Sequence, residues 1–186
     1  MTSPTELSNI AVSRLGGEAI TDIGEGSTGA RLCSLHYDIV LNSLLREHEW
    51  NFAIKRKSLA LDVTAPVNGF AHRFALPDDW LKVVRINDAY TDDYRIEGLF
   101  LLCDLSVVYL EYIAKVTDPN LMDAQFVDVF AQRLAAEIAY PLTKNSTLTE
   151  SAWKIYNDKI RMARTMDAKE GQPRNIEADT WLGARF

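Results

Sequence analysis

The chain has 186 residues, of which 47% are hydrophobic and 25% are charged, a composition typical of one medium-sized domain or of a domain with a small insert. Aspartate and glutamate number 26 against 20 lysines and arginines, so the formal net charge is -6. This balance argues against sequence-independent binding to nucleic acid, which needs a basic face. No apolar run approaches the roughly 18–20 residues of a membrane span, and the N-terminus lacks the basic-then-apolar order of a signal peptide. The composition therefore predicts a soluble, acidic, non-secreted protein.

Two helices are expected in the first fifty residues. The capping box Ser3–Glu6, with proline at the first helical position, predicts a first helix, and Gly16-Gly17 end it. The second helix is expected from Ser27 to about Glu49. It carries an apolar stripe of Leu32, Leu35 and Ile39, which is widened by Cys33, Tyr37, Val40, Leu41, Leu44 and Leu45. A stripe this broad indicates burial against more than one neighbour.

Residues 51 to about 117 predict a small antiparallel β unit of five or six strands. Polar and apolar residues alternate there, and β-branched and aromatic residues are frequent. Trp50 and Phe52 are expected in the core. The expected strands are 52–61, 72–76, 81–86, 94–103 and 107–113, and the segment 94–103 forms either a hairpin that turns near Gly98 or two short strands.

Two further helices are expected after Asp118-Pro119. The first has the core stripe Phe126, Phe130, Leu134 and Ile138, and Pro141 ends or kinks it. A second capping box, Thr147–Glu150, predicts the start of the last helix, and Gly171 and Pro173 are its stop signals. Its expected inward residues are Ala152, Ile155, Tyr156, Ile160, Ala163 and Met166, and its expected outward residues are Lys154, Asp158, Arg161 and Lys169.

This order of elements predicts an α+β fold. We expect an antiparallel bundle of about four helices, formed by residues 1–50 and 118–171, with a small antiparallel β domain inserted at 51–117. An extended C-terminal tail, residues 172–186, carries Trp181, Leu182 and Phe186. A disordered tail normally lacks such residues. The tail is therefore expected either to dock on a partner chain or to fold back on its own subunit.

Motifs for cofactor or metal chemistry are missing from the sequence, and we expect neither a cofactor nor a metal. Cys33 and Cys103 are far apart and predict two buried thiols, and the histidines His36, His48 and His72 do not supply metal-ligand spacing. The loop Gly24–Ser27 precedes a helix N-terminus, where backbone amides could bind an anion. A plain turn with Ser27 as the N-cap is the favoured interpretation.

Two kinds of charged cluster, acidic pairs and a basic run, each have two possible interpretations. Paired carboxylates could act in glycoside hydrolysis, and the candidates are Asp78-Asp79, Asp92-Asp93 and Glu47 with Glu49; the alternative is a solvated surface. The basic run Lys55-Arg56-Lys57 is interpreted as the rim of a subunit interface or as a solvated face. The same two interpretations are open for Arg161 and Arg164 on the last helix.

Five segments, in a single order that covers most of the chain, carry a resemblance to a known family. The segments are Arg14–Gly17 running through Ser27 into a helix that ends Leu44-Leu45, with Trp50–Arg56 and Leu59; Leu76–Val83; Tyr94–Gly98 with an apolar run to Asp104; Tyr112-Ile113 and Val116–Pro119, followed by Phe126, Leu134–Ala139 and Leu142-Thr143; and Asp179–Arg185. Together they resemble the tail tubular protein A type adaptors of the head-to-tail connector in short-tailed phages.

The resemblance implies a structural virion protein without catalytic activity. Such adaptors form a ring, usually of twelve subunits, beneath the portal, where they extend the DNA channel and dock the tail nozzle. It implies the virion as location, with assembly in the host cytoplasm, and double-stranded DNA passing without specific binding. It also implies portal docking by Trp181, Leu182, Arg185 and Phe186. Contacts with a neighbouring subunit or the nozzle are expected from Lys55, Arg56, Lys57, Asp92 and Asp93. The alternative function is a tail-associated cell-wall or polysaccharide hydrolase that uses Glu47, Glu49, Asp78 or Asp79.

Overall fold

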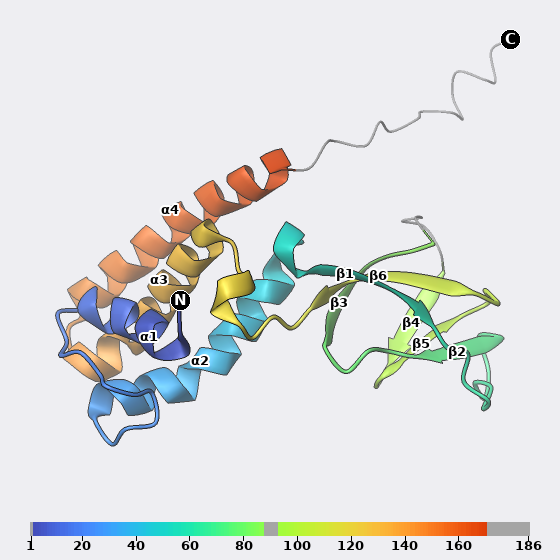
Figure 1. Ribbon diagram of the computed structural model, residues 1–186, viewed down its shortest axis with the longest axis horizontal. Helices are drawn as coiled ribbons and strands as arrows, with labels where there is room; N and C mark the ends of the chain where they lie inside the picture. The colour runs from blue at the N-terminus through green and yellow to red at the C-terminus, as the bar shows by residue number, and fades with distance from the viewer. Residues whose placement is uncertain (1, 88–92, 171–186) are drawn as a thin grey trace, which may run out of the picture.

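The computed structural model describes residues 2–87 and 93–170. It has a helical bundle at one end and a β unit that projects from the other end (Figure 1). The bundle is built from both ends of the chain and the β unit from its middle, so the predicted α+β fold with an inserted antiparallel β unit is confirmed.

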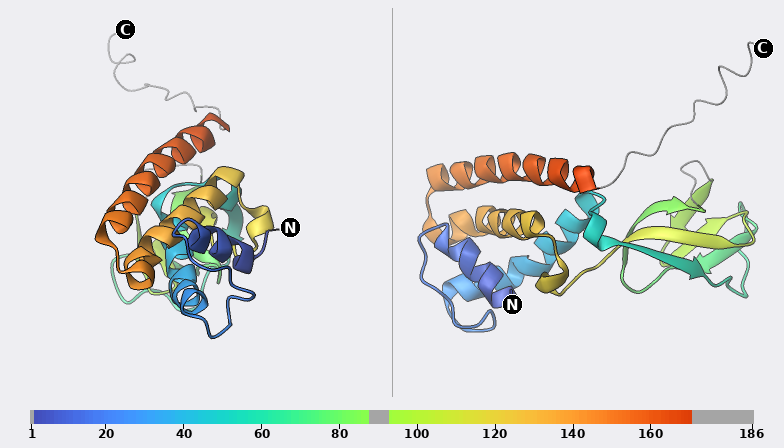
Figure 2. Two further views of the ribbon diagram at one scale, coloured as in Figure 1. Left: turned by 90° about the vertical axis from the view of Figure 1, so that its left-hand side faces the viewer. Right: turned by 45° about the horizontal axis from the view of Figure 1, so that its top comes forward.

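The bundle contains four α-helices: α1 (Pro4–Ser13), α2 (Thr28–Glu47), α3 (Ala124–Thr143) and α4 (Ser146–Glu170). Single 3-10 turns, η1 (Asn51–Ala53) and η2 (Pro119–Leu121), stand at the two connections with the β unit. Helix α3 packs against each of the other three helices, and α2 and α4 lie on opposite sides of it (Figure 2). The predicted stripe on α3, Phe126, Phe130, Leu134 and Ile138, is fully buried.

The helix ends confirm one predicted capping box and contradict the other. In α1 the Ser3 hydroxyl accepts from the Glu6 N–H at 3.1 Å, and the Glu6 carboxylate accepts from the Ser3 N–H at 2.7 Å. The box predicted at Thr147–Glu150 is wrong, because α4 already begins at Ser146 and Asn145 Oδ1 accepts from the Leu148 N–H at 3.1 Å. Lys144 closes α3 in the left-handed conformation, with φ of 54°, which leaves Asn145 as the cap.

Pro141 does not end α3, which continues to Thr143. A proline costs a helix the hydrogen bond to the carbonyl four residues earlier. Here it stands in the last turn, close to the left-handed C-cap at Lys144, so the lost hydrogen bond falls at the end of the helix and not in its middle.

The predicted burial is wrong for two residues on α2 and for two residues on α4. Leu35 and Ile39 on α2 are mostly exposed, whereas the residues that widen the same predicted stripe, Cys33, Tyr37, Val40, Leu41, Leu44 and Leu45, are buried. On α4, Ile155 and Met166 are about half exposed, whereas Ala152, Tyr156, Ile160 and Ala163 are buried as expected. The outward positions Lys154, Asp158, Arg161 and Lys169 are exposed, as expected. Periodicity finds apolar faces but cannot decide which of two faces meets a neighbour.

The β unit consists of two three-stranded antiparallel sheets. One has the order β1-β6-β3 and the other β2-β5-β4. Gly98, with φ of 59°, turns the β4–β5 hairpin, so the hairpin alternative for 94–103 is confirmed. The strands are β1 (Ile54–Leu59), β2 (His72–Ala75), β3 (Trp80–Ile86), β4 (Tyr94–Glu97), β5 (Phe100–Cys103) and β6 (Val108–Ala114).

Strand β6 contributes to two separate hydrophobic cores. Its residues Val108, Leu110, Tyr112 and Ala114 belong to the core of the β unit, together with Phe74, Ile86 and Leu101. Ile113, which points to the other face because side chains alternate along a strand, belongs to the core of the bundle. The sheet β1-β6-β3 therefore links the two halves of the molecule.

Candidate functional site: the bundle–sheet junction and the charged surfaces

The residues expected to dock on the portal, Trp181, Leu182, Arg185 and Phe186, lie outside the described residues, as does Asp92. The stop signals Gly171 and Pro173 lie outside them as well. Asp93 is exposed immediately before β4.

Successive side chains of the basic run Lys55-Arg56-Lys57 do not share one face of strand β1. Lys55 Nζ donates to Asp79 at 2.7 Å, whereas Arg56 Nε donates to Glu111 at 3.2 Å, and Lys57 is exposed. Successive side chains of a strand point to opposite faces. The run is therefore not one basic patch, and two of its three cations already have a carboxylate partner.

Glu111 is a buried carboxylate at the centre of the sheet β1-β6-β3. Its side chain is 6% exposed and lies 3.2 Å from Arg56 Nε and 3.3 Å from Arg85 Nε. Register places it directly across from Arg56 on β1 and from Arg85 on β3. Because a buried charge is tolerated only when it is paired, this row of three side chains holds the two edge strands to β6.

Asp79 is held by two donors. Besides Lys55, the Tyr112 hydroxyl donates to Asp79 at 2.9 Å. Burial favours a higher pKa for Asp79, but the hydrogen bonds from Lys55 and Tyr112 outweigh it and hold the pKa below its usual value. Burial, and then the bond to Asp79, raise the pKa of Tyr112 to about 12. The pair therefore stays a hydroxyl bonded to a carboxylate across the neutral pH range.

Trp50 anchors the junction between α2 and β1. Its side chain is fully buried, and its indole Nε1 donates to the Leu44 carbonyl at 2.9 Å. Phe126 of α3 meets its ring edge-on, with the ring centroids 5.0 Å apart, and His48 does the same at 4.8 Å. Phe52 is partly buried against the same core. The predicted core role of Trp50 and Phe52 is confirmed.

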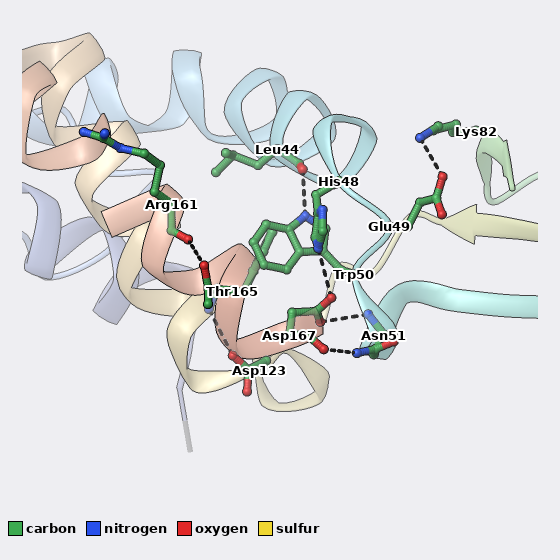
Figure 3. Close-up of polar contacts among 11 residues, drawn as sticks. Leu44, His48, Glu49, Trp50, Asn51, Lys82, Asp123, Arg161, Thr165 and Asp167 are labelled. Atoms are coloured by element: carbon green, nitrogen blue, oxygen red, sulfur yellow. Dashed lines mark hydrogen bonds and ion pairs between the residues drawn. The ribbon is translucent and has the colours of Figure 1, made fainter. Parts of the chain in front are cut away.

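Asp167, near the end of α4, binds the same junction (Figure 3). Its carboxylate accepts from the Asn51 backbone N–H at 3.0 Å and lies 3.0 Å from His48 Nε2. The Asn51 side-chain amide donates to the Asp167 carbonyl at 2.6 Å. The Asp167 side chain is 8% exposed. These contacts fix the direction in which α4 leaves the bundle relative to the start of the β unit.

Asp167 is not among the candidate site residues predicted from the sequence. The signal was present, because Asp167 follows the inward residues Ala163 and Ile160 at helical spacing. A charged residue on an inward face indicates a buried polar contact. Its partners could not be found from the sequence, since Asn51 and Asp167 stand 116 residues apart.

The carboxylates of the hydrolase alternative have structural partners. Glu47 binds Arg164 at 2.5 Å and accepts from the Tyr156 hydroxyl at 3.2 Å, and Glu49 binds Lys82 at 3.1 Å. Asp78 is exposed beside Asp79. Three hollows, of about 410, 260 and 480 Å³, lie on the described surface, and none of these four carboxylates lines them. No observation among the described residues favours the hydrolase.

A second charged cluster holds α1, α3 and α4 together. Asp128 on α3 forms ion pairs with Arg14, at the end of α1, and with Lys159 on α4. Arg14 also donates to the Asp128 backbone carbonyl at 3.0 Å. Burial favours a higher pKa for Asp128, but the hydrogen bond from Lys159 and the charge of Arg14 outweigh it and lower the pKa.

The loop before α2 is a turn, as favoured from the sequence. The Glu25 carboxylate accepts from the Thr21 N–H at 2.9 Å and from the Ser27 hydroxyl at 2.6 Å, and Ser27 caps α2 by accepting from the Ala30 N–H at 3.2 Å. The chain thus places its own carboxylate beside this helix N-terminus. The bond from Ser27, with that from Thr21, lowers the pKa of Glu25.

Both cysteines, Cys33 and Cys103, are buried and unbonded to each other, as predicted. Within residues 2–87 and 93–170, no group of three histidine, cysteine or acidic side chains is placed to hold a metal ion. No helix in that same part of the chain has the length and apolar character needed to cross a membrane.

Comparison with known proteins does not assign the chain to a family. No protein-family model matches it, and no curated protein matches it. The function is therefore inferred from the residues and their arrangement.

Proposed function

We propose that this protein is a structural adaptor of a phage head-to-tail connector. In this proposal it forms a ring, of about twelve copies as in the adaptors it resembles, that joins the portal to the tail nozzle. The ring extends the DNA channel for retention and ejection of the genome. It acts in the virion, after assembly in the host cytoplasm, and has no catalytic role.

One structural observation carries the proposal: the described chain has a helical bundle followed along one direction by a β unit, and each has its own hydrophobic core. A helical bundle suits side-by-side packing in a ring, and a β unit that projects from one end of the bundle (Figure 1) offers a surface to the next component along an axis. The five ordered segments that resemble the adaptor family support the same function.

The net charge of -6 per chain also supports a conduit. Repeated around a ring, acidic walls repel phosphates and leave DNA free to move. The charge argues against tight binding of DNA and is compatible with its passage.

The position at which the tail starts supports docking. The last helix is tied to the junction by Asp167, whose contacts with Asn51 hold this end of α4 in place. A tail that leaves from a fixed point can bind a partner without moving the bundle. In the proposal Trp181, Leu182, Arg185 and Phe186 bind the portal.

Electron microscopy of the chain mixed with the portal protein encoded in the same genome tests the proposal. We expect rings seated on the portal. Deletion of residues 174–186 should abolish this complex while the isolated chain keeps its unfolding temperature. A chain that stays monomeric and never engages the portal would contradict the proposal.

A single substitution gives a graded test of the tail. If Trp181 is a buried anchor, Trp181→Ala should weaken portal binding by about 2–4 kcal/mol, which corresponds to roughly 30- to 1000-fold in Kd. Glu177→Ala, in the same tail, is the matched control and should leave Kd nearly unchanged. Loss of thermal stability on tail deletion would show instead that the tail packs on its own subunit.

A further inference from the structure

Two apolar stripes on the bundle are exposed to solvent. On α2, Leu35 and Ile39 are each 65% exposed. On α4, Ile155, Met162 and Met166 are 46%, 63% and 48% exposed. Isolated exposed apolar residues are ordinary on protein surfaces. Two aligned sets, each with a pair at i and i+4, are the pattern of helix faces that pack against another helix.

The two stripes cannot cover each other within one chain. Helices α2 and α4 approach each other near the junction, where Glu47 binds Arg164 and Tyr156, and α3 lies between the rest of the two helices (Figure 2). Leu35 and Ile39 stand on the side of α2 away from its buried residues Tyr37, Leu41 and Leu44, and that buried side packs in the bundle core with α3. The α2 stripe therefore points away from the rest of its own bundle.

We propose that the α2 stripe of one copy packs against the α4 stripe of the next copy, an interface that rests on the proposed ring. Both helices run toward the β unit, because α2 ends at the junction and Asp167 of α4 is bonded to it. A rotation about an axis along the bundle preserves these directions. The α2 helix of one copy and the α4 helix of its neighbour then meet in parallel.

When the two helices pair in parallel, one register brings two apolar residues of α2 opposite two apolar residues of α4 and also brings opposite charges together. When Leu35 faces Met162 of the next copy, Ile39 faces Met166, four residues further along both helices. The exposed Arg31, four residues before Leu35, then faces the exposed Asp158, four residues before Met162. Asp158 is also paired with Arg161 of its own helix at 2.6 Å. Opposite charges at the rim of an apolar contact favour one register over others, and flexible methionine side chains adapt to branched partners.

The contact joins two different surfaces, so it is heterologous. Such a contact generates a closed ring when the rotation closes and a filament when it does not. A twofold dimer could pair α2 with α4 only if both stripes lay on one face of the chain, and α3 lies between the two helices (Figure 2). The chemistry of the stripes therefore favours a cyclic assembly over a dimer.

Cysteine cross-linking tests the pairing directly. Leu35→Cys and Met162→Cys chains are prepared separately and mixed, then treated with a short bismaleimide, alone and on the portal protein. The native Cys33 and Cys103 are fully buried and provide an unreactive background. We expect a cross-link between the two variants in the mixture, and none when either variant is treated by itself. A chain that carries both substitutions should give a ladder of covalent oligomers.

The outcomes separate this inference from the proposed function. Rings on the portal without a 35–162 cross-link would overturn the interface and leave the adaptor function standing. Cross-links of either variant with itself, without any cross-link between the two different variants, would overturn the proposed interface in favour of a twofold contact. Absence of both rings and cross-links would overturn the interface and the function together.

A charge substitution supplies an independent readout. Leu35→Asp should abolish assembly seen by sedimentation velocity on the chain with its portal, and should leave the unfolding temperature of the isolated chain unchanged. Leu99→Asp, at a leucine of the β unit that is 71% exposed, is the matched control and should assemble like the native chain. Normal assembly of Leu35→Asp would overturn the proposed interface.

Discussion

The Asp167 carboxylate accepts a hydrogen bond from the Asn51 backbone N–H at 3.0 Å, across 116 residues of sequence. This contact joins the last turns of the chain's final helix to the first residues after α2. The bundle and the start of the β unit thus meet at one point. Because Asp167 is almost fully buried, we interpret the contact as a structural one that holds α4 against the residues after α2.

Asp167→Ala should destabilise the fold by about 2–3 kcal/mol, because it leaves the Asn51 N–H without its acceptor in a nearly buried place. Asp167→Asn is the matched control, since its side-chain oxygen can still accept that bond, and it should lose less. Urea unfolding followed by circular dichroism measures both. Equal stability of the alanine variant and the native chain would show that water replaces the carboxylate without loss.

The ion pairs of Asp128 predict a dependence on pH. The pKa of this carboxyl is lower in the fold than in the unfolded chain, so the charged form is stabilised by folding. The stabilisation is fully present above the unfolded pKa of about 3.9, and it is lost as the pH falls through the lower folded value.

Asp128→Asn should therefore cost about 1–2 kcal/mol at pH 7, a value reduced for the partial exposure of the side chain. The difference in unfolding free energy between the two chains should shrink below about pH 4. Denaturant titrations at both pH values measure this difference. A difference that is the same at both would contradict the assignment of the effect to the Asp128 charge.

Phe130 lies at the centre of the bundle core, fully buried and edge-on to Tyr37 with ring centroids 4.9 Å apart. Phe130→Ala should destabilise the fold by about 3–5 kcal/mol through the lost contacts and the cavity left behind. Leu35→Ala, at an exposed position of the same bundle, should change stability by less than about 0.5 kcal/mol. Thermal unfolding of the two variants separates the buried from the exposed apolar positions.

The row Arg56–Glu111–Arg85 predicts unequal costs for its members. Glu111→Ala should cost about 3–5 kcal/mol, because it removes a buried carboxylate that lies between Arg56 and the Arg85 guanidinium, which is only 13% exposed. Arg56→Ala should cost less than about 1 kcal/mol, since its side chain is 73% exposed and well hydrated. Denaturant unfolding measures both, and similar losses for the two would contradict a buried role for Glu111.

Local signals in the sequence determined the elements of this protein. The Ser3–Glu6 capping box, the Phe126–Ile138 stripe and the glycine at the β4–β5 turn depend on residues within a few positions of one another. The interactions that produce these features act between residues within a short stretch of chain. The order of the elements was enough to predict an inserted β unit, because helices on both sides of it can share one core.

Tertiary structure alone decided which faces and charges have partners. Leu35 and Ile39 obey the helical period as well as Tyr37 and Leu44 do, and the position of α3 determines which set is buried. Lys55 and Arg56 are neighbours in sequence, yet they bind carboxylates on opposite faces of a sheet. Asp167 meets Asn51 only because α4 returns to the junction. Burial and pairing arise from contacts between distant residues, which no local pattern contains.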